Sequence, residues 1–172
     1  PLWSRGLGDV YKRQAVGERA ARDNSQDIED VLTGADMVFV TAGEGGGTGT
    51  GGAPIVAGIA RGLGALTVAV VTKPFSFEGK RRADNAEHGI EKLRDACDTL
   101  ITIPNDRLLQ QEDKTISINE AFSKADEVLF NGVQGITDLI STPGLINVDF
   151  ADVKSVLADS GAALMGIGRA SG

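Results

Sequence analysis

The sequence has little of the chemistry that builds disulfides, zinc sites or membrane spans. Its 172 residues include one cysteine, Cys97, and one histidine, His88. A single cysteine excludes an intrachain disulfide, and no cluster of cysteine and histidine exists to hold zinc. No apolar run approaches the roughly 18 residues that a membrane-spanning helix needs, and the N-terminus has no apolar signal core. We therefore expect a soluble protein of a reducing, intracellular setting, with no metal held by side chains and no insertion into a membrane.

Basic residues are also in the minority. The chain has 17 lysines and arginines against 24 aspartates and glutamates, a formal net charge of -7. This balance argues against nucleic acid or an acidic membrane surface as a partner, because phosphates attract basic patches. Hydrophobic residues make up 41% of the chain and charged residues 24%, which is the composition of a globular domain with a real core. Disorder and fibrous repeats are thereby excluded.

The first 14 residues differ from the rest. They contain the only tryptophan and the only tyrosine, Trp3 and Tyr11, and their apolar positions follow neither a helical nor a strand period. We expect residues 1–14 to be a disordered tail, or foreign sequence attached to a truncated start, and we assign no function to them.

From residue 15 onward, the apolar patterns alternate between helix and strand. Helical spacing is found in 15–32 with a break near Asn24, in 55–63 with Pro54 in the first turn, in 86–97, and in 118–140. Buried strands are predicted at 37–42, 66–72 and 99–105, and a last helix is expected to run from the NVDFADV segment toward Ala162. Such alternation predicts an α/β fold, a parallel sheet with helices on both faces, followed by a long central helix that Pro143 stops.

Seven of the 23 glycines lie between Gly43 and Gly52, in a segment between a predicted strand and a predicted helix. Backbone N–H groups and the positive end of a helix dipole can surround phosphate oxygens there, and two threonine hydroxyls add donors. A flexible linker is the alternative, but linkers rarely lie between a buried strand and an amphipathic helix. We therefore predict a phosphate-binding loop made of Gly45, Gly46, Gly47, Thr48, Gly49, Thr50 and Gly51.

Two better-known phosphate motifs fit this segment less well. It is not a Walker A loop, because no Gly-Lys-Ser/Thr follows at the required offset. Gly47, Gly49 and Gly52 satisfy the dinucleotide pattern G-x-G-x-x-G, but that motif needs an acidic residue at the end of the next strand. That strand ends in Thr72 and a lysine, so NAD is disfavoured.

Several polar residues allow both a functional and an ordinary interpretation. Phe122 and Asp126 lie four apart on the long helix, where a ring and a carboxylate can hold guanine, and Asn105 can add an amide contact. A core phenylalanine and a solvated aspartate are the alternative. Glu78 and Arg82, also four apart, would ordinarily be a surface ion pair. Asp149 and Asp152 either cap a helix or orient a water molecule between two carboxylates.

Taken together, the segments GGGTGTG, TKPFSFEGKRR, ITIPNDRLL, ADEVL and PGLINVDFADV strongly resemble the FtsZ family, bacterial relatives of tubulin. The resemblance extends from about Ala15 to Gly172. It implies a GTPase that binds GTP or GDP, with Mg²⁺ carried by the nucleotide, and that polymerises head to tail with copies of itself. It also implies a cytoplasmic location at the division site, in the cytokinetic ring, with other division proteins and membrane tethers bound through parts outside this chain.

The resemblance also assigns roles to individual residues. It implies that the Gly45–Gly51 loop holds the phosphates with Thr72 nearby, and that Glu78 and Arg82 contact ribose or phosphate. It implies that guanine is held by Asn105, Phe122 and Asp126. It further implies that Asn147, Asp149 and Asp152 complete the site of a neighbouring subunit, where the carboxylates act on the attacking water.

The family has a further phosphate loop before the position of Ala15 and a second domain after the long helix. We therefore expect residues 15–141 to be part of a GTP-binding domain, residues 142–172 to be the catalytic loop and the start of a C-terminal domain, and the chain alone to be an inactive fragment. Two alternatives are another tubulin-like GTPase, for plasmid partition or membrane shaping, and a non-catalytic nucleotide-binding remnant.

Overall fold

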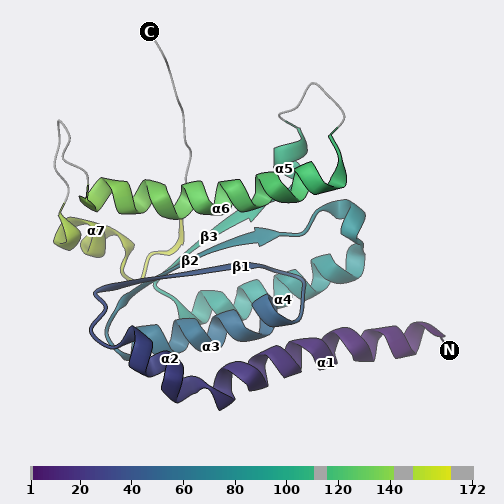
Figure 1. Ribbon diagram of the computed structural model, residues 1–172, viewed down its shortest axis with the longest axis horizontal. Helices are drawn as coiled ribbons and strands as arrows, with labels where there is room; N and C mark the ends of the chain where they lie inside the picture. The colour runs from purple at the N-terminus through teal and green to yellow at the C-terminus, as the bar shows by residue number, and fades with distance from the viewer. Residues whose placement is uncertain (1, 111–115, 142–148, 164–172) are drawn as a thin grey trace, which may run out of the picture.

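The computed structural model describes residues 2–110, 116–141 and 149–163, and side chains from residue 13 onward (Figure 1). No helix in these ranges is long and apolar enough to cross a membrane. The elements in chain order are α1 (Leu2–Asp23), α2 (Ser25–Leu32), β1 (Met37–Gly43), α3 (Thr48–Gly62), β2 (Leu66–Lys73), the 3-10 turn η1 (Ser76–Glu78), α4 (Lys80–Ala96), β3 (Thr99–Pro104), α5 (Asp106–Leu109), α6 (Ile118–Ser141), α7 (Phe150–Leu157) and β4 (Gly161–Ala163).

The four strands form one sheet in the order β1-β2-β3-β4, and each neighbouring pair is parallel. The central strand β2, with the sequence LTVAVVTK, is buried at every position except its last. Near-continuous apolar sequence is typical of a parallel strand that is covered on both faces. The predicted parallel α/β fold is therefore confirmed.

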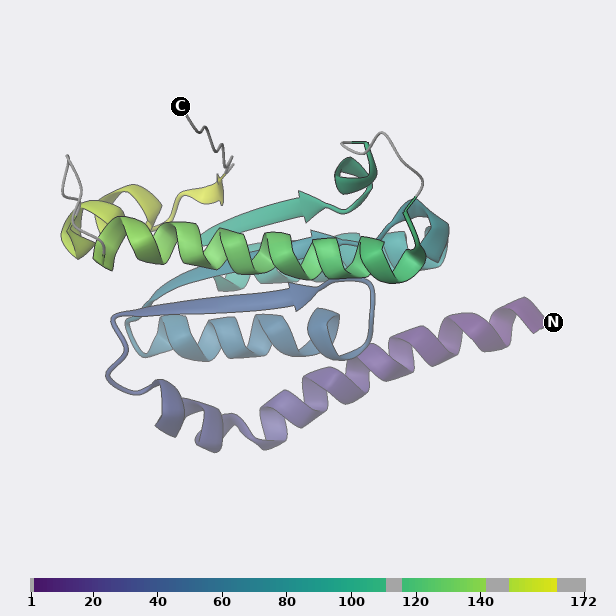
Figure 2. The ribbon, with the colours of Figure 1, turned by 45° about the horizontal axis from the view of Figure 1, so that its top comes forward.

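Helices cover both faces of this sheet, α3 and α4 on one side and α6 and α7 on the other (Figures 1 and 2). The alternation of side chains along β2 divides the core between the two faces. Ala69 and Val71 pack in the cluster with α3 and α4, whereas Val68 and Val70 pack in the cluster with α6 and α7. The predicted long helix is α6, whose apolar stripe, including Ile136, is buried against the sheet.

Three predictions about element boundaries are wrong. Helix α1 begins at Leu2, so residues 2–14 are helical and not a disordered tail, while the alternative of foreign sequence stays a prediction. Further along this helix, Gly17 lies against the backbone of Gly47, where α3 begins, so no side chain fits between them. Helix α3 begins at Thr48, which places Pro54 in its second turn and not in its first. The predicted break near Asn24, between α1 and α2, is confirmed.

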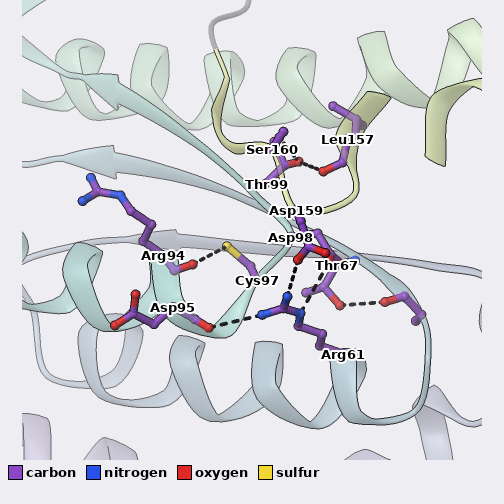
Figure 3. Close-up of polar contacts among 11 residues, drawn as sticks. Arg61, Thr67, Arg94, Asp95, Cys97, Asp98, Thr99, Leu157, Asp159 and Ser160 are labelled. Atoms are coloured by element: carbon purple, nitrogen blue, oxygen red, sulfur yellow. Dashed lines mark hydrogen bonds and ion pairs between the residues drawn. The ribbon is translucent and has the colours of Figure 1, made fainter. Parts of the chain in front are cut away.

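The last predicted helix is shorter than expected. Helix α7 ends at Leu157, and β4 then joins the sheet beside β3. A polar network fixes this segment (Figure 3): the Arg61 side chain pairs with both Asp98 and Asp159, and the Thr99 hydroxyl donates to the carbonyl of Leu157. The C-terminal end of α7 is thus fastened to the start of β3. The expected stop at Pro143 lies outside the described residues.

Candidate nucleotide-binding site

The site lies where the parallel strands end. Figure 2 shows β1, β2 and β3 running toward the same edge of the sheet, where α3 and α6 begin. Loops that follow parallel strands gather at such an edge, which is the usual place for ligands in open α/β sheets. The glycine segment therefore lies at the edge where a ligand is expected.

A cleft of about 210 Å³ opens at this edge. It brings together residues that are far apart in the sequence, from the glycine loop, the end of β2, the start of α4, the end of β3 and the first turns of α6. Predicted binding residues that line it are Gly46, Thr72, Glu78, Arg82, Asn105, Phe122 and Asp126. Other lining residues include Gly43, Glu44, Pro74, Ala125 and Leu129.

The glycine loop is held from within by two side chains. Gly45, whose φ of +99° favours glycine, donates its N–H to Thr50 Oγ1 at 2.9 Å. Asn85 of α4 donates from Nδ2 to the carbonyl oxygens of Gly45 at 3.0 Å and Gly46 at 3.2 Å. Thr50 is fully buried, so its hydroxyl braces the loop, whereas Thr48 is exposed at the first position of α3.

Packing requires glycine at four positions of the loop, Gly45, Gly47, Gly49 and Gly51, and is tightest at the last two. A Cβ at Gly49 would lie 2.6 Å from the carbonyl oxygen of Gly43, and a Cβ at Gly51 would lie 2.2 Å from that of Gln14. The backbone of α3 therefore rests directly against β1 and α1. Because Gly47 is the N-cap of α3, the unpaired N–H groups of the first helical turn open at this end of the sheet.

One side of the cleft, which we refer to as the base side, has an aromatic wall at Phe122. Phe122 is 40% exposed and meets the rings of Phe75 and Phe77 edge to face, at centroid distances of 5.6 and 6.1 Å. Phe75 is buried and stacks on Phe77 at 4.9 Å. The interpretation of Phe122 as a simple core residue is therefore wrong, because its ring is partly open to the cleft beside Asp126.

Two further polar groups line the cleft. Asn105 is only 4% exposed, and its Oδ1 has no hydrogen-bond partner within the described part of the chain. Glu78 accepts the N–H of Phe75 at 2.8 Å and pairs with Arg82 at 2.5 Å. The four-residue spacing of Glu78 and Arg82 thus does give an ion pair, and both members border the cleft.

Sequence reasoning missed two buried polar residues beneath the loop, Glu44 and Asn85. Neither oxygen of the Glu44 carboxyl has a partner among the described residues, and burial raises its pKa to about 7. A glutamate inside a glycine run, directly after a buried strand, is the signal that could have drawn attention to it. Nothing in the local sequence marks Asn85, because its partners are 39 and 40 residues away.

The predicted catalytic carboxylates lie elsewhere. Asp149 is the N-cap of α7, where its Oδ1 accepts the N–H of Asp152 at 2.9 Å and its own N–H donates to Asp152 Oδ2 at 3.4 Å. Figure 1 shows α7 at the end of α6 opposite to α5. The residues of α6 that line the cleft, from Phe122 to Leu129, lie in the first half of that helix. The structure therefore does not bring these residues to the cleft of their own chain, and Asn147 lies outside the described residues.

Comparison with known proteins identifies the family. The sequence model described as "Tubulin/FtsZ family, GTPase domain" matches residues 4–113, which is more than half of the chain. The chain belongs to the tubulin/FtsZ family of GTPase domains. This agrees with the fold and with the position of the cleft.

Solved structures place the chain nearer to FtsZ than to CetZ. An empty FtsZ dimer from M. jannaschii is 51% identical with a TM-score of 0.82, and covers 86% of this chain and 43% of its own. A point mutant of the same FtsZ is 50% identical with a TM-score of 0.84, over 88% of this chain and 45% of its own. CetZ from Methanosaeta thermophila is 20% identical with a TM-score of 0.70, over 86% and 41%, and shares the fold alone. The chain is thus FtsZ-like and spans less than half the length of these structures.

Proposed function

We propose that the cleft binds GTP or GDP and that, within a polymer of identical subunits, the bound GTP is hydrolysed. The observation that carries this proposal is the convergence of the Phe122 ring, the side chains of Asn105 and Asp126, and the ion pair of Glu78 and Arg82 on one cleft. This cleft borders Gly46, two residues before the start of α3. A solved CetZ1 from Haloferax volcanii with the same fold is described as GDP bound, which supports a nucleotide as the ligand.

Phosphates would lie at the glycine loop. The N–H groups at the start of α3 and the helix dipole both favour an anion there, and Thr72 lies at the end of the adjacent strand. Arg82 is the cation that borders the cleft, and its pairing with Glu78 directs it there. The described residues hold no cluster of three acidic, histidine or cysteine side chains, so Mg²⁺ would be held mainly by the phosphates and water and would neutralise their charge.

Guanine fits the polar groups of the base side better than adenine does. Guanine presents N1–H and an exocyclic amine as neighbouring donors, and a carboxylate such as Asp126 accepts both. The unpartnered Oδ1 of Asn105 offers one more acceptor. Adenine offers a donor beside an acceptor on its edge, so one oxygen of Asp126 would face a lone pair.

Hydrolysis would require a second copy of the chain. Helix α6 has 24 residues and is about 36 Å long at 1.5 Å per residue, and it separates Asp149 and Asp152 from the cleft. One subunit cannot bring both ends together, whereas head-to-tail contact places the α7 end of one subunit on the cleft of the next. The M. jannaschii FtsZ dimer supports self-association. We place this polymer in the cytoplasm at the division site, where other division proteins and tethers bind outside the described residues.

The guanine assignment is tested by Asp126→Ala in a hybrid in which residues 15–172 replace the matching half of M. jannaschii FtsZ. Loss of the carboxylate leaves the donors of guanine unpaired and costs about 1–3 kcal/mol of GTP binding, with ATP binding unchanged. Asp138→Ala is the matched control, because Asp138 is exposed on the same helix, where it accepts from Gln134. Calorimetry that finds parental GTP affinity in Asp126→Ala contradicts the assignment.

The trans-acting role is tested by Asp152→Ala in the same hybrid. We expect intact GTP binding, loss of most turnover, and poisoned turnover when the variant is mixed with parent. A role limited to helix capping would instead cost about 1 kcal/mol of folding stability and leave turnover per folded subunit unchanged. Normal turnover with a lowered melting temperature would therefore refute the catalytic assignment.

A further inference from the structure

A buried polar pair beneath the glycine loop has no role in the function proposed above. Glu44 follows β1 and is 4% exposed, and Asn85 lies on α4 and is 6% exposed. Neither carboxyl oxygen of Glu44 has a partner in the described ranges, and neither does Oδ1 of Asn85. Three buried acceptor atoms thus lie under the loop without a close hydrogen bond, and the Thr50 hydroxyl is the donor that acts on the Glu44 carboxyl. Buried acceptors that are poorly paired cost free energy.

Both side chains belong to the contact between the loop and α4. Asn85 donates to two loop carbonyls, and a Cβ at Gly89, one helical turn further on, would lie 2.4 Å from Glu44 Oε2. The same point is 2.4 Å from Cγ2 of Thr50. The Glu44 carboxyl is therefore enclosed between the backbone of α4 and the methyl group of Thr50.

Charged groups on the surrounding elements are paired with other residues or lie on the surface. Helix α3 carries one charged residue, Arg61, in its last turn. On α4 and around the cleft, Asp84, His88 and Asp126 are exposed, as is Arg13 on α1. The ion pairs of these elements are Arg82 with Glu78, Lys73 with Glu87, Arg61 with Asp98 and Asp159, and Arg22 with Glu18.

Protonation removes the buried negative charge of the Glu44 carboxyl. Burial disfavours the charged carboxylate more than the hydrogen bond from Thr50 favours it, so the pKa of Glu44 is raised to about 7. In its protonated form, the carboxyl is neutral and can donate a hydrogen as well as accept one. Near neutral pH, Glu44 therefore exchanges between a neutral carboxyl and a negatively charged carboxylate.

Asn85 sets which way the loop faces. In a trans peptide the C=O of one residue and the N–H of the next point in opposite directions. Because the carbonyls of Gly45 and Gly46 point at Asn85, the N–H groups of Gly46 and Gly47 point away from α4. This is the orientation that an anion at the loop requires.

We propose that Glu44 and Asn85 form a proton-binding support of the phosphate loop, in which Asn85 is a positioning residue and a proton on Glu44 holds the loop in its anion-binding form. The proposal rests on the proposed function only for the identity of the anion. Ionised Glu44 places a negative charge behind the loop that phosphates must approach. Phosphate binding and protonation of Glu44 therefore favour each other.

The first test uses the chain itself and needs no nucleotide. Carbon-detected NMR follows the Glu44 carboxyl with pH, assigned by its loss in Glu44→Gln, and amide exchange follows the Gly45 N–H. We expect a Glu44 midpoint near neutrality, and Gly45 protection that falls about tenfold between pH 6 and pH 8 in the parent but not in Glu44→Gln. Glu87→Gln, an exposed change on α4, keeps the parental pH profile.

Three outcomes would overturn the proposal. The first is a Glu44 midpoint at the ordinary value for glutamate, which requires no variant to fold. The second is the same loss of Gly45 protection in Glu44→Gln as in the parent. The third is a midpoint that moves when potassium replaces choline in the buffer, since a bound monovalent cation would then occupy the site in place of a proton.

A second test separates this proposal from the proposed function. In the FtsZ hybrid, GTP affinity falls about tenfold from pH 6 to pH 8 relative to Glu44→Gln, as linkage to one proton requires. Equal pH profiles in the parent and Glu44→Gln overturn the linkage even if GTP binds well. A hybrid that binds no GTP refutes the proposed function, while the NMR titration still decides whether Glu44 holds the proton.

Discussion

The hydrogen bond from Gly45 to Thr50 holds the glycine loop, and a substitution at Thr50 measures its contribution to the free energy of unfolding. Its side chain is fully buried, and its Oγ1 accepts the N–H of Gly45, which is itself buried. Thr50→Val keeps the branched shape but removes the acceptor. The Gly45 N–H then has no partner and no access to water, which costs about 1–3 kcal/mol of unfolding free energy.

Urea unfolding of the chain measures this cost. For a domain of this size, about 1–3 kcal/mol corresponds to a fall of roughly 2–12 °C in melting temperature. Thr48→Val is the matched control, because Thr48 is exposed two residues away, and a change of less than about 0.5 kcal/mol is expected there. Thr50→Ser separates the hydroxyl from the methyl group that packs near Gly89.

Two results would refute this reasoning. If Thr50→Val is as stable as the parent, the bond from Gly45 contributes nothing to the loop. If Thr48→Val loses as much stability as Thr50→Val, the effect belongs to any β-branched substitution at the start of α3 and not to the buried hydroxyl.

Three further predictions concern stability. Gly89→Ala places a methyl group 2.4 Å from Glu44 Oε2 and should lower the free energy of unfolding by about 1–3 kcal/mol. The control Gly58→Ala has open space around it and should raise the free energy of unfolding by up to about 1 kcal/mol. Equal melting temperatures of the two variants would contradict the crowding at Gly89. The pKa of Glu44 in the folded protein is about 7, above the ordinary 4.5. The contribution of Glu44 to the free energy of unfolding is therefore full below pH 4.5 and falls by roughly 3 kcal/mol as the pH rises to 7. Parallel profiles of stability against pH in the parent and in Glu44→Gln would contradict this pKa shift. Asp159→Asn keeps a residue that tolerates the φ of +53° and loses only an exposed ion pair, so chemical denaturation should show a cost below about 1 kcal/mol, smaller than that of Asp159→Ala.

The elements that could be predicted from the sequence are those whose burial is written in their own pattern. Strand β2 is apolar and β-branched along most of its length because both of its faces are covered, and α6 shows its stripe because one face packs on the sheet. Strand β4 could not be predicted, since Gly161–Ala163 has no pattern of its own and is a strand only through its pairing with β3. The start of α1 was missed because its apolar residues show no clear helical period, and the close approach of α1 to α3 lies further along the helix, at Gln14 and Gly17.

The candidate site was predictable to the same extent. Spacing indicated the pair of Glu78 and Arg82, and the position of the glycine loop after a strand indicated its place at the sheet edge. Spacing could not show that Thr50 faces inward while Thr48 faces outward, because that depends on how α4 packs against α3. For the same reason Glu44 and Asn85 were missed, since a polar residue is recognised as buried only once its distant neighbours are known.

The two interpretations of Asp149 and Asp152, helix cap and water-orienting pair, are not exclusive in this structure. The capping box joins the two carboxylates through each other's backbone N–H groups, and both residues are exposed at the N-terminus of α7. The N-terminal end of a helix dipole favours negative charge at that end. The bonds that cap α7 therefore also fix the distance between the carboxylates, and the network of Arg61 with Asp98 and Asp159 fixes the other end of the same short helix. If a second subunit presents its cleft here, it meets a pair that is already oriented, and loss of the cap would lower turnover before it lowered the amount of folded protein.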